Sequence, residues 1–236
     1  MDLYEKFIRT INDFPIPGIK FRDITPLLSD GNAFHQAIMD LNKELPSYDN
    51  WDKIIAAESR GFLFASPLAA INSKGLVLAR KAGKLPLVGY RETYKLEYGE
   101  ATIEIPKDSI KPGDRVIIMD DLIATGGSAK AMVDLVRQAG GIPIMGLFLI
   151  ELRSLQGYKQ LGIPAISIVN YGLHKNDLLQ VESKNGNMAK FIEKIDENDV
   201  EVEFDNGVKE TINKNKIISI VQVEKNGRLT YIKYRD

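Results

Sequence analysis

The stretch that decides the fold is residues 116–128, which read V-I-I-M-D-D-L-I-A-T-G-G-S. Its apolar, β-branched start predicts a buried strand, and the small residues after it predict a loop that leads into a helix. Such a loop leaves backbone amides uncovered, and the following helix adds unpaired N–H groups and the positive end of its dipole. We therefore expect a site for a phosphate monoester. The alternative is a strand-turn-helix joint whose polar residues only cap the helix.

Two adjacent carboxylates, Asp120 and Asp121, stand between this strand and the loop. Capping a helix needs one such side chain, and a pair facing a bare phosphate would repel it. Carboxylates accept hydrogen bonds, so the pair suits the two hydroxyls of a ribose whose 5-phosphate lies in the loop. The stretch has neither the G-K-[ST] of a P-loop nor the G-x-G-x-x-G of a dinucleotide site.

Short apolar runs alternate with helical segments on both sides of this stretch. This pattern predicts an α/β fold with an open, mainly parallel sheet covered by helices on both faces. Ligands of such sheets bind at the carboxyl ends of the strands. At the N-terminus, Tyr4, Phe7, Ile8 and Ile11 have helical spacing, so a helix is expected over 2–11. The expected strands are 54–57, 76–79, 116–119, 144–150 and 166–169, with a helix at 128–140.

The character of the sequence changes after Tyr171, where Asn, Lys and Glu become frequent. We place a domain boundary there, with one domain at 1–174 and a C-terminal extension at 175–236. Apolar residues between Met188 and Ile195 predict a short amphipathic helix. Asn-Gly turns favour hairpins, so the rest of the extension is expected to be a small antiparallel sheet of three or four strands. The expected strands are 200–204, 217–223 and 229–234.

Composition excludes several classes of protein. The 236 residues are 44% hydrophobic and 27% charged, as in ordinary globular proteins. The absence of cysteine excludes disulfides, thiolate metal sites and cysteine nucleophiles. A formal net charge of -1 gives no general attraction to nucleic acid or to an anionic membrane. No signal peptide or membrane-spanning run is visible. We therefore expect a cytoplasmic protein that binds neither nucleic acid nor a membrane.

Three more polar segments follow or interrupt the predicted strands. Residues 58–62 read E-S-R-G-F, and the cation Arg60 at a helix start opposes the helix dipole unless an anion lies nearby. Residues 80–84, R-K-A-G-K, hold three cations in five positions, a pattern also typical of a solvated basic loop. Residues 94–100 lie in a long excursion from the sheet, where functional loops are common.

The stretch at 116–128 resembles the signature of the type I phosphoribosyltransferases, in which four apolar residues, two acidic residues and a short apolar step precede T-G-G. That signature binds the ribose-5-phosphate part of 5-phosphoribosyl-1-pyrophosphate (PRPP). The resemblance implies a type I phosphoribosyltransferase-like sheet. The residues that it assigns to the sugar phosphate are Asp120, Asp121, Ala124, Thr125, Gly126, Gly127 and Ser128.

Residues 1–171 as a whole resemble the adenine phosphoribosyltransferase family. In that family E-S-R-G-F is the pyrophosphate loop, which implies that Ser59 and Arg60 hold the leaving group and that the peptide bond before Ser59 is cis. The family's R-K-x-G-K-L-P loop implies that Lys81 and Lys84 approach pyrophosphate, in part from the neighbouring subunit of a homodimer.

The segment Y-x-L-E-Y-G at 94–99 is similar to the catalytic loop of these enzymes. It implies that Glu97 faces N7 of the purine as general base, with Tyr98 in the substrate site. Judged by composition alone, Glu97 is one of 32 acidic residues and would be solvated.

The segment at 14–26, F-P-I-P-G-I-K-F-R-D-I-T-P, is similar to the family's N-terminal hood, which we place within residues 1–30. The backbone around Lys20, Phe21 and Arg22 would read the adenine edge, with the Phe21 ring packed on the base. Lys20 stands where an aliphatic residue is common. The alternative is a surface loop in which Arg22 pairs with Asp23.

The resemblance implies an enzyme of purine salvage that forms AMP and pyrophosphate from adenine and PRPP with Mg²⁺. The metal would be held mainly by substrate phosphates and water, with no dedicated protein ligand. Two alternatives remain: a related xanthine or guanine phosphoribosyltransferase, and a non-catalytic regulator that senses PRPP. The presence of Glu97 argues against the regulator.

Overall fold

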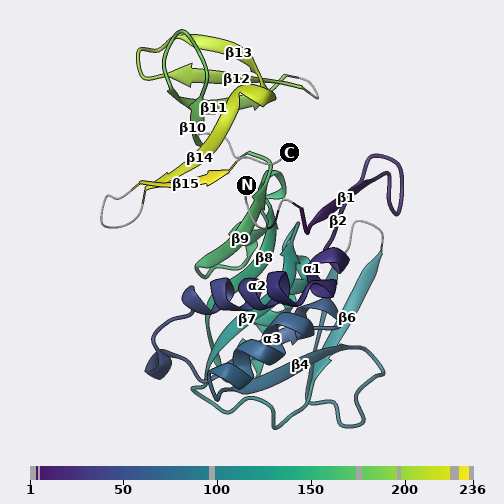
Figure 1. Cartoon of the computed structure of the whole chain (residues 1–236). Helices are drawn as coiled ribbons and strands as arrows, with labels where there is room; N and C mark the ends of the chain where they lie inside the picture. The colour runs from purple at the N-terminus through teal and green to yellow at the C-terminus, as the bar shows by residue number, and fades with distance from the viewer. Residues whose placement is uncertain are drawn as a thin grey trace. The chain divides into compact units, whose positions relative to one another are not determined.

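The chain divides into two compact units in the computed structural model (Figure 1). One unit comprises Met1–Glu151 and Gly157–Val169, and the other comprises Leu152–Gln156 and Asn170–Asp236. The structure describes residues 4, 6–95, 99–173, 177–195, 198–223 and 229–233. Within these ranges, no helix combines the length and the apolar character needed to cross a membrane.

The first unit is built on a seven-stranded sheet with the order β5-β6-β4-β3-β7-β8-β9. Strand β3 pairs in parallel with β4 and β7, and β7 pairs in parallel with β8. Strands β5 and β6 form an antiparallel hairpin that joins the sheet beside β4. The strands are β3 (Lys53–Ala57), β4 (Gly75–Lys81), β5 (Tyr90–Lys95), β6 (Glu100–Ile105), β7 (Arg115–Ile123), β8 (Ile142–Leu152) and β9 (Ala165–Tyr171).

Helices cover both faces of this sheet, as the sequence predicts. Figure 1 shows α2 and α3 over one face, and α3 contacts β3, β4 and β7. Alternate residues of a strand point to opposite faces. Accordingly Val116 and Ile118 join the core beneath α4, while Ile117 and Met119 are buried on the other face. The helices are α1 (Thr25–Ser29), α2 (Gly31–Lys43), α3 (Arg60–Ile71) and α4 (Gly127–Gln138), with short 3-10 turns at Tyr48–Asn50, Arg153–Leu155, Gly157–Gln160 and Lys214–Lys216.

The helix predicted over residues 2–11 is wrong. Tyr4 and Ile8 are buried as the spacing requires, but a single turn, in which the Ile8 amide donates to the Tyr4 carbonyl at 3.0 Å, is enough to place them. The chain then continues as strand β1 (Arg9–Asn12), which pairs antiparallel with β2 (Lys20–Asp23). An ion pair of 2.6 Å between Arg9 and Asp23 ties the two strands together. The helical spacing of these few apolar residues therefore did not produce a helix, because residues 9–12 pair with β2 instead.

The second unit is an antiparallel sheet of six strands with the order β13-β12-β11-β10-β14-β15, more strands than the three or four predicted. Each pair of neighbours is antiparallel. The turn at Asn206 and Gly207 joins β12 to β13 as predicted, and residues 224–228, with the second Asn-Gly turn, lie outside the described ranges. The strands are β10 (Leu178–Val181), β11 (Met188–Lys194), β12 (Asp199–Phe204), β13 (Lys209–Asn213), β14 (Ile217–Val223) and β15 (Leu229–Lys233).

The helix predicted between Met188 and Ile195 is also wrong, because this segment forms the inner strand β11. Ala189 and Phe191 are buried and Lys190 between them is exposed, which is the alternation of a strand with one buried face. Pairing with β10 and β12 on both sides outweighs the helical spacing of the apolar residues.

Candidate active site

The predicted phosphate loop connects the end of β7 to the first turn of α4. Gly126 has a φ of +87°, and a Cβ atom there would lie 2.3 Å from the carbonyl oxygen of Gly157. Only glycine fits this backbone and this contact. The side-chain amide of Gln160 donates to the Thr125 carbonyl at 2.8 Å, so the loop is held from a second segment. The loop and the start of α4 thus present the small residues that the sequence predicts for an anion site.

The two aspartates behind this loop have different surroundings. Asp121 accepts a hydrogen bond from Nε of Arg60 at 2.6 Å, although the two residues are 61 positions apart. Its side chain is 7% exposed, against 48% for Arg60. Asp120 is buried and accepts from the Asp121 amide at 2.9 Å. Burial and then the charge of Asp121 raise the pKa of Asp120 well above its usual range. The acidic pair and the predicted pyrophosphate loop therefore meet at one end of the sheet.

Gly61 makes this meeting possible, although the sequence analysis did not single it out. A Cβ atom at position 61 would lie 2.8 Å from Oδ1 of Asp120 and 3.3 Å from the carbonyl of Met119. The first turn of α3 can approach the end of β7 because this residue has no side chain. The glycine that follows the arginine in E-S-R-G-F was the available signal.

The predicted pyrophosphate loop and basic loop are joined by Glu58. Its peptide bond to Ser59 is cis, as the resemblance implies. Its carboxylate accepts from Lys84 Nζ at 2.6 Å, from Arg80 Nε at 3.1 Å and from the Lys81 amide at 3.1 Å. These bonds, that from Lys84 above all, lower the pKa of Glu58 to about 2. Sequence reasoning missed the role of Glu58, whose partners follow 22 to 26 residues later.

The predicted hood places Phe21 next to Arg60. The guanidinium carbon of Arg60 lies 5.6 Å from the centre of the Phe21 ring, and Phe14 packs edge-on against the same ring at 5.2 Å. Lys20 is exposed, whereas Arg22 is buried and donates to the Thr10 hydroxyl. Asp23 pairs with Arg9, so the structure does not show the alternative in which Arg22 pairs with Asp23.

Glu97 and Tyr98 lie outside the described residues, but the strands on either side of them are described. Lys95 ends β5 opposite Glu100, the first residue of β6. The Lys95 carbonyl approaches the phosphate loop so closely that a Cβ atom on Gly127 would lie 3.1 Å from it. Burial and then the charge of Asp120 raise the pKa of Tyr94. Lys95, the last described residue before Glu97, therefore lies beside the phosphate loop.

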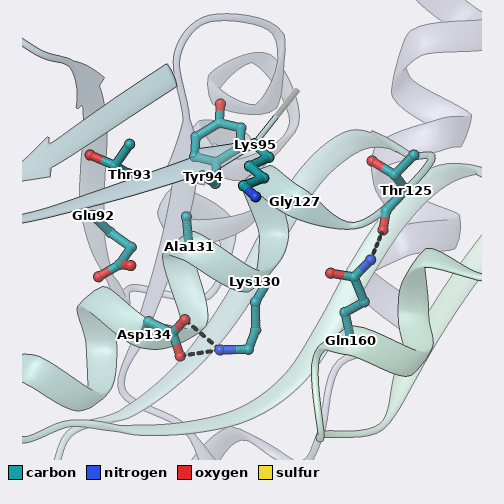
Figure 2. Close-up of a pocket in the computed structure, with 10 residues that line it drawn as sticks. All are labelled: Glu92, Thr93, Tyr94, Lys95, Thr125, Gly127, Lys130, Ala131, Asp134 and Gln160. Carbon is teal, nitrogen blue, oxygen red and sulfur yellow. Dashed lines mark hydrogen bonds and ion pairs between the residues drawn. The ribbon is translucent and has the colours of Figure 1, made fainter. Parts of the chain in front are cut away.

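A cavity of about 340 Å³ lies between β5 and the start of α4 (Figure 2). Its lining includes Thr125 and Gly127 of the phosphate loop but neither Asp120 nor Asp121. Figure 2 shows Lys130 in an ion pair with Asp134 on its wall. The cavity is therefore a neighbour of the predicted sugar-phosphate site on the flank of α4.

No group of three or more His, Asp or Glu side chains in the described part of the chain is arranged to hold a metal ion. The carboxylate of Asp121 accepts a hydrogen bond from Arg60, and that of Asp120 accepts a hydrogen bond from the backbone amide of Asp121. This donor set suits a metal that is bound through a polyphosphate and water.

Three carboxylates should make the stability of the fold sensitive to acid. Hydrogen bonds from Thr25 and Arg9 lower the pKa of Asp23 to about 2, and those from Arg115 lower the pKa of Asp52 to about 2, as Lys84 does for Glu58. A carboxylate whose pKa is lower in the folded state contributes stability above its unfolded pKa, about 4, and loses it as pH falls toward 2.

We therefore expect the melting temperature to fall between pH 4 and pH 2, the interval bounded by the ordinary carboxyl value and the pKa of Asp52. Thermal unfolding followed by circular dichroism measures this. Asp52→Asn should show a smaller fall than the unaltered chain, because the Arg115 contact no longer titrates. A melting temperature that is constant over this interval would contradict the assignment.

Comparison with known proteins agrees with the geometry. The family described as "Phosphoribosyl transferase domain" matches residues 28–147. The adenine phosphoribosyltransferase of Rubrobacter xylanophilus is 49% identical over 166 residues, which are 70% of this chain and 89% of the relative. That of Agathobacter rectalis is 50% identical over 161 residues, 68% of this chain and 92% of the relative.

Solved structures give the same result. The adenine phosphoribosyltransferase of Thermoanaerobacter pseudethanolicus has a TM-score of 0.69 and 47% identity, and covers 72% of this chain and 100% of its own. The Saccharomyces cerevisiae enzyme, solved with an imino-altritol bisphosphate and adenine, has a TM-score of 0.64 and 38% identity. The match covers 69% of this chain and 94% of the yeast chain. This chain is longer than its relatives, in keeping with a C-terminal extension. On this evidence the chain belongs to the adenine phosphoribosyltransferase family.

Proposed function

We propose that the chain catalyses the purine-salvage reaction of its family, in which adenine and PRPP become AMP and pyrophosphate. The observation that carries the assignment of residues is the contact of 2.6 Å between Arg60 and Asp121. It brings the residues proposed for the leaving group to those proposed for the ribose. A phosphoribosyl transfer needs this juxtaposition, because the bond that breaks joins the ribose to the pyrophosphate.

The sugar phosphate is proposed to lie across the end of β7. Backbone amides of residues 124–128 and the dipole of α4 would bind the 5-phosphate. Asp121 would accept from a ribose hydroxyl. The raised pKa of Asp120 allows this carboxyl to hold a proton more readily than an ordinary aspartate does, which reduces its repulsion of the nearby phosphate.

The leaving pyrophosphate is proposed to lie on Ser59, Arg60, Lys81 and Lys84. As the bond from C1 of the ribose to pyrophosphate loosens, negative charge grows on the departing oxygen and positive charge grows on the ribose. Cations that are already in place stabilise the first of these without reorganisation. Ser59 and Arg60 are exposed at the start of α3, and Lys81 and Lys84 are exposed in the basic loop, so all four can be reached by an anion.

The base is proposed to lie under the hood, where Lys20 and Arg22 contribute backbone groups and Phe21 packs on the ring. The position of Arg60, 5.6 Å from the Phe21 ring, supports a flat site next to the leaving group. Glu97 would accept the N7 proton as N9 bonds to the ribose, with Tyr98 beside it.

Mg²⁺ is proposed as the cofactor, held by diphosphate oxygens and water. When bound, it supplies positive charge to the phosphate oxygens. The residues present fit this arrangement, because Asp121 already accepts a hydrogen bond from Arg60 and Asp120 already accepts one from the backbone. In this arrangement, Arg60 and the basic loop position the diphosphate.

A cytoplasmic homodimer is proposed as the working form. The exposed apolar side chain of Leu87, 79% accessible, lies three residues after the basic loop and supports contact with a second subunit there. The chain has no cysteine, which fits a reducing compartment. Sedimentation equilibrium should give twice the chain mass of 26.4 kDa, and a monomer at working concentration would contradict the proposal.

The direct test incubates the protein with adenine, PRPP and Mg²⁺ and measures AMP. Competition by unlabelled guanine, xanthine and hypoxanthine separates adenine specificity from that of a related enzyme. Tight binding of PRPP with no nucleotide formed from any purine would instead identify a regulator.

Asp121→Asn should raise the KM for PRPP by about tenfold or more, with a smaller change in kcat. The variant removes the charge that accepts from Arg60, and a charged hydrogen bond contributes about 1.5–3 kcal/mol. Steady-state kinetics with PRPP varied at saturating adenine measures this. An unchanged KM would exclude Asp121 from the ribose site.

We propose that residues 1–174 form the phosphoribosyltransferase domain and 175–236 an extension with its own core. The apolar side chains of the second unit form a separate cluster, which supports this division. Deletion of residues 180–236 retains Asp177 and its contact of 2.5 Å with the buried Arg153. The shortened chain should stay folded and form AMP, and complete loss of activity would contradict the division. Its mass in solution reports whether the extension contributes to assembly.

A further inference from the structure

Glu58 lies where the two segments proposed for pyrophosphate meet. Its side chain is 12% exposed and contacts two of the three cations of the basic loop, Arg80 and Lys84. It also accepts from the backbone amide of Lys81. One carboxylate thus holds the side chains and the backbone of a loop that follows a different strand.

A second carboxylate also holds the basic loop. Glu104 on β6, whose side chain is 2% exposed, accepts from the Gly83 amide at 3.2 Å and pairs with Arg91 at 3.0 Å. The Ala82 amide donates to the Thr102 carbonyl at 3.0 Å. The loop backbone therefore keeps its position without help from Lys84. The side chain of Lys84 is 49% exposed, so it can leave Glu58 without disturbing buried atoms.

The Glu58 carboxylate and a bound diphosphate would compete for the Lys84 ammonium. The Lys84 ammonium lies 2.6 Å from the Glu58 carboxylate, at the distance at which it would also bind a phosphate oxygen. A diphosphate that reaches Lys84 must share or replace this carboxylate, and the two anions repel each other at short range. With its pKa lowered to about 2 by the bond from Lys84, Glu58 is charged at neutral pH.

We propose that Glu58 is a positioning residue that competes with pyrophosphate for Lys84, and so limits the affinity of the site for its product. This inference rests on the proposed function. Between turnovers Glu58 would keep Lys84 in place beside Arg80. During release it would recapture the ammonium as the diphosphate leaves. The pyrophosphate site would then be assembled in advance without holding its product tightly.

The test is the affinity of the full chain for magnesium pyrophosphate, measured by titration calorimetry. Glu58→Gln keeps the shape of the side chain and one acceptor oxygen but removes the charge. Its Kd for pyrophosphate should fall roughly tenfold, because the Lys84 ammonium then no longer has to leave a charged carboxylate before it binds the diphosphate. Glu58→Ala, made in parallel and checked by its melting temperature, should tighten binding in the same direction. An unchanged or weaker affinity in the folded variants overturns the proposal.

A double-mutant cycle identifies the partner. Lys84→Met alone should weaken pyrophosphate binding, and in that background Glu58→Gln should change the Kd by less than about threefold. A full tenfold gain that persists without Lys84 would overturn the competition. If Lys84→Met leaves the Kd unchanged, the pyrophosphate site itself is misplaced, which is a failure of the proposed function. Asp52→Asn, which removes a carboxylate that contacts Arg115, is the matched control and should leave the Kd unchanged.

Discussion

Gly126→Ala should weaken the binding of ribose 5-phosphate by about 100-fold or more while the chain remains folded. A Cβ atom at this position would lie 2.3 Å from the Gly157 carbonyl oxygen and 2.9 Å from its carbon. These are backbone atoms, so no side chain can swing aside to relieve the contact. The φ of +87° adds a cost of about 1–2 kcal/mol for a residue with a side chain. The loop must therefore move, and the amides proposed for the phosphate move with it.

Gly113→Ala provides the control for this prediction. Gly113 has nearly the same φ, +86°, but an added Cβ atom meets nothing within 4 Å. The two variants share the backbone cost and differ in the contact with Gly157. Melting temperatures should fall in both, and calorimetric titration with ribose 5-phosphate should show weak binding only for the variant at 126. Equal binding by both variants would mean that the amides of the loop do not hold the phosphate.

The phosphate loop and the central strands could be predicted because their signals are local. The strand predicted at 116–119, the small residues after Ile123 and the helix expected at 128–140 follow one another in sequence, and the structure has them as β7, the loop and α4. Strands buried on both faces are continuous apolar runs, so their pattern is not shared with amphipathic helices. The parallel core was therefore predictable.

The two wrong helices have the same physical cause. Tyr4 and Ile8, like Met188 and Ile192, have helical spacing, but each segment is short and its apolar side chains are also satisfied by a turn or a strand. Pairing with β2 in one case and with β10 and β12 in the other decided the outcome. The partner strands are other segments of the chain, and the spacing of apolar residues within one segment does not predict which strand will pair with it.

The contacts that organise the site are non-local as well. Arg60 contacts Asp121 from 61 positions away, and Glu58 contacts Arg80 near the end of β4 and Lys84 in the loop after it. Single-sequence reasoning predicted the arginine and the lysines from motifs, but it gave Glu58 and Gly61 no role. Their roles depend on how β3, β4 and β7 lie side by side, which determines the loops that meet.

Glu97→Gln should lower kcat by about 100-fold or more, with a much smaller change in the KM for PRPP. Glutamine has nearly the same shape but cannot accept the proton from N7 of the purine as N9 bonds to the ribose. Glu97 lies outside the described residues, and the described residues before it support this role. The Lys95 carbonyl packs on Gly127 of the phosphate loop, and the charge of Asp120 contributes to the raised pKa of Tyr94.

Glu100→Gln is the matched control, since Glu100 is an exposed carboxylate at the start of β6, three positions further along the chain. Its kcat should equal that of the unaltered chain. Asp121→Asn should show the opposite division of effects from Glu97→Gln, with KM for PRPP changed more than kcat. Initial rates of AMP formation, with each substrate varied in turn, separate the three cases. A Glu97→Gln variant with full activity would show that the proton of N7 leaves by another route, and Glu97 would then have no part in the chemical step.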